Sequence, residues 1–233
     1  MSLRTFITGL ATTFGVAWLA VIVVPYLKMR DLQPVLMSDE PDAALFYPKR
    51  TGRVADGAQI YAENGCYLCH TQVVRPIYAG NDLYRPDWGG LQADENRGDT
   101  RRETNPYDFE GETFAQIGVN RIGPDLSNLG RRMDALQAAG TDAEKWLYAH
   151  LYDPRLDPEL YNSTCPPHPF FFEKRRVHGT GSPDALAVDA GEGYELVPRP
   201  AARALVSYLL SMKKDHPAPA TFDFAPAKGD SES

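Results

Sequence analysis

The stretch GCYLCH at positions 65–70 is the most informative part of this 233-residue chain. It places two thiols three positions apart and an imidazole directly after the second thiol. A Cys-x-x-Cys-His run is the sequence signal for attachment of a c-type haem. The two thiols add across the vinyl groups of the porphyrin, and the histidine is then close enough to bind the iron. We therefore predict one covalently attached haem c, held by Cys66, Cys69 and His70.

The same pattern also occurs in redox-active cysteine pairs and in one half of a zinc site. A structural zinc site needs two further Cys or His ligands at similar spacing. Outside the motif the chain has one other cysteine, Cys165, and four histidines that are scattered singly: His150, His168, His178 and His216. The composition therefore favours haem over zinc.

The second decisive feature is the uncharged segment TFITGLATTFGVAWLAVIVVPYL at positions 5–27. About 20 apolar residues are enough to cross the hydrocarbon core of a bilayer. The alternative is a cleaved signal peptide, which has a shorter apolar core and a small-residue cleavage site soon after it. Here the segment ends in VPYLKMR, so we predict that residues 1–30 form a retained transmembrane anchor.

The haem motif indicates the location of the protein better than its flanking charges do. Arg4 precedes the apolar segment, while Lys28 and Arg30 follow it, so the positive-inside rule does not fix the orientation. In bacteria, haem is attached to this motif outside the cytoplasmic membrane. We therefore predict a single-pass protein of the bacterial inner membrane, in contact with lipid, with its haem domain on the periplasmic side. So few thiols also suit an oxidising compartment.

Length and composition predict one modest domain after the anchor. About 200 residues are a normal size for a single domain. The net charge of −7 argues against nucleic acid as a partner. We expect a linker over residues 31–50, a mono-haem cytochrome c domain over 51–214, and a tail rich in Pro and Ala over 215–233 that is disordered or loosely docked. The predicted fold class is mainly α: one N-terminal transmembrane helix plus a loop-rich c-type cytochrome domain.

Three helices are predicted in the domain. Residues 56–64 form a short amphipathic helix capped by Asp56 and run straight into the haem motif. Residues 142–152 have apolar residues at helical spacing, and residues 200–212 begin with proline, which suits a first helical turn. Between the first two helices, residues 75–120 contain turn-forming sequences and are expected to be long polar loops.

The ordered pattern along the chain resembles subunit II of cbb3-type cytochrome c oxidases, the mono-haem FixO/CcoO family. The resemblance covers residues 5–212. It is carried by Gly57 to Tyr61, the haem motif with Thr71-Gln72, Arg75-Pro76, the RIGPDL run from Arg121 to Leu126, Gly130, His150-Leu151, Pro154-Arg155, and Ser163 to Pro166.

The resemblance implies a non-catalytic electron-transfer subunit. Electrons from a cytochrome c donor would pass through this haem to a large multi-span haem–copper catalytic subunit, where oxygen is reduced. Two other functions remain open: a membrane-anchored mono-haem cytochrome of another complex, such as a nitric oxide reductase, and a haem sensor. A ligand that changes with redox state, or admits carbon monoxide, would favour the sensor.

The sequence departs from the family at the second axial ligand of the iron. The family has a methionine there, in a Ser-Asn-Met-Pro segment, whereas positions 163–166 read Ser-Thr-Cys-Pro. Cys165 at the methionine position makes this a divergent member, and we take Cys165 with His70 as the iron ligands. The alternatives are His168, a methionine (Met133 or Met212), or an open or water-bound position. The choice matters because Met raises the redox potential and a thiolate lowers it.

Several further residues are candidates for contact with the cofactor. Arg75, just after the haem motif, is the better candidate for a haem propionate, and Pro124 is also assigned to the cofactor site. The Lys-Arg-Arg cluster at 174–176, in a long segment over 170–195, either reaches a propionate or a partner chain or forms a solvated surface run. His150 matches a family position that does not bind iron, so we expect it to pack or to form hydrogen bonds.

Overall fold

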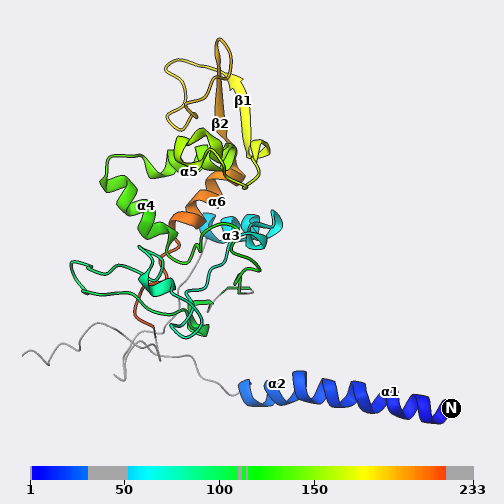
Figure 1. The fold of residues 1–233 in the computed structure, drawn as a ribbon. Coiled ribbons are helices and arrows are strands. Elements are labelled where there is room, and N and C mark those ends of the chain that lie inside the picture. The colour runs from blue at the N-terminus through cyan, green and yellow to red at the C-terminus, as the bar shows by residue number, and fades with distance from the viewer. Residues whose placement is uncertain (1, 31–51, 110–111, 114, 219–233) are drawn as a thin grey trace, which may run out of the picture. The chain divides into compact units, whose positions relative to one another are not determined.

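The computed structural model describes residues 2–30, 52–109, 112–113 and 115–218. The chain divides into two compact units, Met1–Phe46 and Tyr47–Ser233. The described part is mostly helical, with one long apolar helix and a loop-rich remainder, which confirms the predicted fold class (Figure 1). The predicted linker at 31–50 lies outside the described residues, as does most of the predicted tail.

The described part of the first unit, residues 2–30, contains one continuous helix. It consists of α1 (Leu3–Trp18), a π-helical turn (Leu19–Val23) and α2 (Val24–Met29). Together these make 27 helical residues whose most apolar stretch has a mean hydropathy of 2.1. Pro25 explains the π turn, because proline lacks an N–H and its ring crowds the preceding turn. By length and composition this helix can serve as a single-pass membrane anchor.

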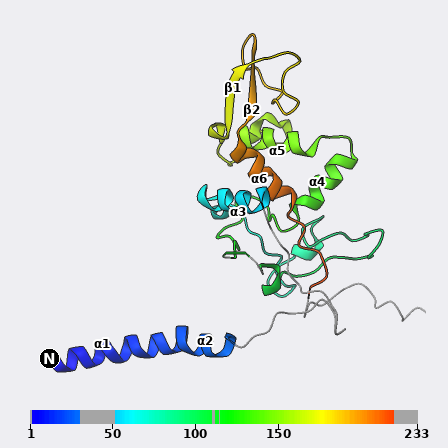
Figure 2. The same ribbon diagram turned by 180° about the vertical axis from the view of Figure 1, so that it is seen from behind.

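The centre of the second unit is the crossing of α3 (Arg53–Glu63) with α6 (Pro200–Leu210), which Figures 1 and 2 show from opposite sides. Gly57 lies directly on the backbone of Ala204, and a Cβ at Gly57 would be 2.1 Å from the Ala204 carbonyl oxygen. Next to this contact, the rings of Tyr61 and Tyr208 pack with their centroids 5.6 Å apart. The glycine therefore allows the two helices to approach closely enough to bury both tyrosines.

Helix α3 begins earlier than the sequence predicted. Its N-cap is Gly52, which has a positive φ of 56°, and Asp56 lies inside the first turn instead of capping it. The expectation that Asp56 is the cap was therefore wrong. An acidic residue in the first turn still interacts favourably with the helix dipole.

Two further helices pack against α6. Helix α5 (Ala143–Tyr152) confirms the prediction over 142–152, and the Asp142 side chain caps it by accepting a 3.0 Å hydrogen bond from the Lys145 N–H. Helix α4 (Leu129–Ala138) was not predicted. Leu129, Met133 and Leu147 from these helices are buried in the same core as α6.

The long segment over 170–195 contains most of a β-hairpin. Strands β1 (Phe172–Arg176) and β2 (Tyr194–Pro198) pair antiparallel, with Phe172 opposite Pro198. Figures 1 and 2 both place this hairpin beyond α5, at the end of the domain opposite the polar loops. The Lys-Arg-Arg cluster lies exposed on β1, where Arg175 pairs with Glu195 at 2.9 Å. Lys174 and Arg176 lie over the ring of Tyr194.

The predicted polar loops contain short 3₁₀ turns, Asp82–Tyr84 and Pro106–Phe109, and are held by buried ion pairs. Arg102 donates to the buried Asp108 at 2.8 Å. The Arg102 Nε also donates to the carbonyl of His216 at 2.7 Å.

The start of the predicted tail belongs to this network. Asp215 is only 2% exposed and accepts hydrogen bonds from Thr100 at 2.8 Å and from Arg131 at 2.9 Å. The chain after α6 is therefore held between the polar loops and α4 as far as His216.

Candidate haem site

The haem motif forms a tight turn directly after α3. Gly65 adopts a left-handed conformation with φ 68°, and a 3₁₀ turn follows over Cys66–Leu68. The N–H of His70 donates to the Cys66 carbonyl at 3.0 Å. Glycine suits this position because a side chain disfavours the left-handed region. The turn thus brings the histidine back towards the first cysteine.

A second stretch of backbone, residues 117–126, lies along the motif and fixes it. The N–H of Val119 donates to the Tyr67 carbonyl at 2.8 Å, and the N–H of Gly123 donates to the Cys69 carbonyl at 2.9 Å. These bonds join residues about fifty positions apart in the sequence. They form a frame against which the His70 ring is placed.

The imidazole of His70 is oriented by Pro124 and Gly123. Its Nδ1 lies 2.8 Å from the Pro124 carbonyl oxygen. An Nδ1–H that donates to a carbonyl leaves Nε2 with its lone pair available to a metal. A Cβ on Gly123 would lie 2.2 Å from the ring carbon Cε1, so glycine is needed for the chain to pass this close. Burial lowers the pKa of His70, which favours the neutral ring that metal binding requires.

The three cysteines are free and partly buried in this structure, and Cys69 and Cys165 lie close enough to Cys66 to influence the pKa of its thiol. Burial, together with smaller contributions from the neighbouring Cys165 and Cys69, raises the pKa of Cys66 to about 12. Burial likewise raises the pKa of Cys165, followed by the influence of Cys69. Cys165 therefore reaches the motif from almost one hundred residues further along the chain.

Two other histidines come to the same region. His168 is attached to the end of α5, because its backbone N–H donates to the carbonyl of Leu151 at 3.0 Å. The ring of His150 stacks on Trp146 with centroids 5.0 Å apart, so it packs as expected. Burial lowers the pKa of His150 to about 4, with smaller contributions from His70 and His168 nearby.

Both histidines carry a buried Nδ1 that has no hydrogen-bond partner among the described residues. A buried polar atom without a partner is costly, and a ligand at the site is one explanation for it. The His150 Nδ1 makes none of the hydrogen bonds that we expected as an alternative to packing.

The two methionines that were alternative iron ligands are core residues. Met133 on α4 is 6% exposed and Met212, just after α6, is fully buried. Both belong to the hydrophobic cluster between these helices. Core packing accounts for their presence without a role at the iron.

Arg75 is held by a buried carboxylate, Asp82, at 2.9 Å. Arg121 binds the same carboxylate at 2.7 Å and also donates to the Thr71 hydroxyl at 2.9 Å. Burial alone would raise the pKa of Asp82, but hydrogen bonds from Arg75 and Arg121 lower it to about 2. Asp82 thus holds Arg75 and Arg121 in place, and Arg121 contacts Thr71, the residue directly after His70. Sequence reasoning missed the roles of Arg121 and Asp82, although Arg121 opens the RIGPDL run.

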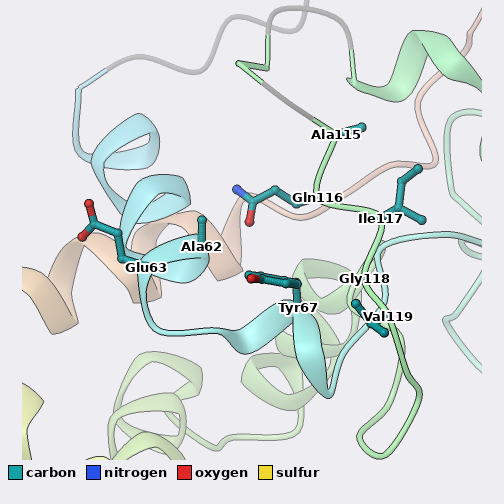
Figure 3. A pocket seen from close by; sticks show the side chains of 8 residues that line it. All are labelled: Ala62, Glu63, Tyr67, Ala115, Gln116, Ile117, Gly118 and Val119. Carbon is teal, nitrogen blue, oxygen red and sulfur yellow. The ribbon is translucent and has the colours of Figure 1, made fainter. Parts of the chain in front are cut away.

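A hollow of about 600 Å³ lies on one side of the motif (Figure 3). Its lining comes from the end of α3, from Tyr67 and from residues 115–119. None of Cys66, Cys69 and His70 lines it, so it is distinct from the candidate haem site.

The donor set around the motif suits haem better than a bare metal ion. Among residues 2–30, 52–109, 112–113 and 115–218, no three His, Cys, Asp or Glu side chains are arranged to hold a metal ion. Two adjacent thiols and an imidazole with a free Nε2 are what a covalent porphyrin needs from its protein. The zinc interpretation therefore has no ligand set in the described part of the chain.

A loop-rich helical domain that contains a Cys-x-x-Cys-His turn, together with one helix in the described residues that is long and apolar enough to cross a membrane, is the arrangement of a membrane-anchored c-type cytochrome. A comparison with protein families identifies the family. Residues 10–194 match the family described as cytochrome c oxidase, mono-haem subunit/FixO. The chain therefore belongs to the mono-haem subunit family of cbb3-type cytochrome c oxidases, whose function is electron transfer within the oxidase. No curated protein matches the chain significantly.

Proposed function

We propose that this chain carries one covalent haem c, bound by thioether bonds to Cys66 and Cys69, with His70 as an axial ligand. The observation that carries the proposal is the 2.8 Å contact between His70 Nδ1 and the Pro124 carbonyl, because an Nδ1–H that donates there leaves the Nε2 lone pair available to an iron. When bound, the haem supplies a one-electron iron couple. The protein contributes the anchor, the orientation of the imidazole and a dry environment. No residue of this chain reduces oxygen; that reaction belongs to another subunit.

The second axial ligand in this proposal is Cys165. Support comes from its position at the family's methionine site and from its influence on the pKa of Cys66, both cysteines being partly buried. His168, three residues further on, is the competing ligand, since its Nδ1 is buried and without a partner among the described residues. A thiolate ligand would give this haem a lower potential than methionine does.

The partners and the location follow from the same proposal. The apolar helix anchors the chain in the bacterial inner membrane, with residues 51–214 as the haem domain on the periplasmic side. Arg75 and Pro124 belong to the surroundings of the haem. A large haem–copper subunit accepts electrons, and a cytochrome c supplies them. The net charge of −7 favours a basic donor, because opposite charges steer association.

The test is a reduced-minus-oxidised visible spectrum of the detergent-solubilised complex, with oxygen uptake recorded on the same sample. We expect c-type and b-type bands together with cyanide-sensitive uptake. A covalently attached haem stays on the chain after denaturation, so its c-type bands remain in the wild-type protein. The Cys66→Ala/Cys69→Ala double variant should lose these bands. A single c-type haem without oxygen uptake, in a preparation that retains its partner chains, would instead favour the nitric oxide reductase or sensor alternative.

A further inference from the structure

The segment that carries Cys165 is a loop attached to α5 at both ends. Near its start, the Asp157 carboxylate accepts a hydrogen bond from the indole N–H of Trp146 at 3.0 Å. At its end, the N–H of His168 donates to the carbonyls of Leu151 at 3.0 Å and Tyr152 at 3.2 Å. These carbonyls belong to the last turn of α5, which has no intrahelical donors left for them. We call residues 157–168 the ligand loop.

The middle of the ligand loop has few backbone partners of its own. Pro166 and Pro167 have no N–H, and residues 162–168 form no helix or strand. Backbone carbonyls in such a segment need donors from elsewhere. Arg155 supplies them: its Nη1 donates to the carbonyl of Ser163 at 2.9 Å and to the carbonyl of Cys165 at 3.1 Å.

Arg155 is itself held in place from the end of α5. Its Nη2 lies 2.9 Å from Asp153 Oδ1, and its backbone N–H donates to the same oxygen at 3.1 Å. Within the loop, the N–H of Cys165 donates to the Ser163 hydroxyl at 3.3 Å. A continuous set of contacts therefore runs from Asp153 through the guanidinium to the backbone on both sides of Thr164.

We propose that Arg155 is a positioning residue for the second axial ligand, which rests on the proposed function of Cys165. By binding two carbonyls that flank Thr164, the guanidinium fixes the direction in which the Cys165 side chain leaves the backbone. A planar guanidinium with several donors can serve two acceptors and one carboxylate at once. Lysine cannot, because it presents a single ammonium on a flexible stem.

The test compares Arg155→Lys and Arg155→Gln in the full-length chain within its complex. Hydrogen bonds from a charged group contribute about 1.5–3 kcal/mol, which corresponds to roughly tenfold or more in an equilibrium. We therefore expect the fraction of ferrous c-type haem that binds carbon monoxide to rise about tenfold in both variants. The ferric low-spin electron paramagnetic resonance signal should fall in parallel.

The controls separate positioning from general stability. Lys145→Gln changes an exposed cation on α5 that lies 3.8 Å from its partner Asp142 and, among the described residues, forms no hydrogen bond or ion pair with the ligand loop, and it should leave both signals unchanged. Covalent haem content should also be unchanged in all three variants, because none of the substitutions touches the motif. Arg155 variants that lower the melting temperature but keep the wild-type resonance signal and carbon monoxide binding would overturn the proposal.

Cys165→Ala distinguishes failure of this inference from failure of the ligand assignment. If Cys165→Ala leaves the resonance signal as in wild type, Cys165 is not a ligand, and the role given to Arg155 falls with it. If Cys165→Ala changes the signal while both Arg155 variants do not, the ligand assignment stands and only the positioning role is refuted.

Discussion

Gly123 shows how one residue without a side chain can decide whether an imidazole is available to a metal. A Cβ at this position would lie 2.2 Å from His70 Cε1. We predict that Gly123→Ala displaces the ring at a cost of about 1–3 kcal/mol, as for other overpacked sites. The ferric low-spin haem signal should decrease relative to haem content. The neighbouring Ile122→Ala, at a position that is 64% exposed, should behave as wild type. Equal signals in the two variants would contradict the tight packing of Gly123 on His70.

Cys165, as the proposed second iron ligand, determines in which direction the redox potential of the haem should change on substitution. Replacing it with methionine restores the family's residue between Ser163 and Pro166. Because methionine raises the potential of a c-type haem relative to a thiolate, Cys165→Met should shift the midpoint potential upward in a redox titration. An unchanged potential together with an unchanged spectrum would show that Cys165 does not bind the iron.

The sequence could indicate the local parts of this site but not the distant ones. Cys66, Cys69 and His70 lie within one six-residue motif, so the sequence alone predicts their chemistry. The contact of Gly123 with the His70 ring joins positions more than fifty residues apart and depends on backbone pairing that no local pattern encodes. The pairing of Asp82 with both Arg75 and Arg121 could not be predicted either, because no local sequence pattern encodes it.

Asp82 also provides a pH-dependent prediction. Its folded pKa of about 2 lies below the reference value of 3.8, so its stabilising contribution is present above about pH 4 and is lost as the pH falls towards 2. Asp82→Asn should destabilise the domain by about 3 kcal/mol at neutral pH and weaken this acid dependence. Unfolding curves followed between pH 2 and 7 would test it. Glu192→Gln, at an exposed carboxylate, should preserve the wild-type curve; an identical curve for Asp82→Asn would refute the prediction.

At the scale of elements, helices with a clear apolar stripe were predictable and the others were not. The apolar pattern located α5 and α6 to within a few residues, and the haem motif marked the end of α3. Helix α4 was missed because its sequence, LGRRMDALQA, contains a glycine and three charged residues. The hairpin β1–β2 was missed because β1 is mostly charged and exposed, so it lacks the alternation that marks a strand.

The crossing of α3 and α6 carries its own prediction. Gly57→Ala would place a methyl group 2.1 Å from the Ala204 carbonyl oxygen, which is backbone and cannot rotate away. We expect the helices to separate and the melting temperature to fall, with a loss of about 3 kcal/mol in the free energy of unfolding. Gln59→Ala, on the exposed side of α3, should stay within about 0.5 kcal/mol of wild type. Calorimetry on the haem-loaded complex would measure both, and similar values would refute the close packing at Gly57.

At the scale of the whole domain, Asp215 in the segment after α6 ties the polar loops to helix α4. The carboxylate of Asp215 accepts a hydrogen bond from Thr100 of the loops and pairs with Arg131 of α4, and the Asp215 side chain is fully buried. The composition of residues 215–233 predicted disorder, since proline, alanine and small polar residues rarely form a core. The buried carboxylate of Asp215 nevertheless holds the start of this segment in the folded domain, because it pairs with Arg97 and Arg131 and removing it would leave Arg131 without its carboxylate partner.

Asp215 and Asp134 make a matched pair of acidic residues for a test of this connection. Both carboxylates pair with cations, but Asp134 is 54% exposed in its pair with Lys213, whereas Asp215 is buried in its pair with Arg131. Removing one member of a buried pair costs about 3–5 kcal/mol, whereas an exposed pair contributes about 0–1 kcal/mol. Asp215→Asn should therefore lower the melting temperature clearly and expose the polar loops to limited proteolysis, while Asp134→Asn does neither.

Burial raises the pKa of Asp215, but hydrogen bonds from Arg131 and Thr100 lower it overall. Its contribution is thus lost only as the pH falls below the normal aspartate range. Equal stability of the two variants at neutral pH would mean that the chain end does not hold the loops.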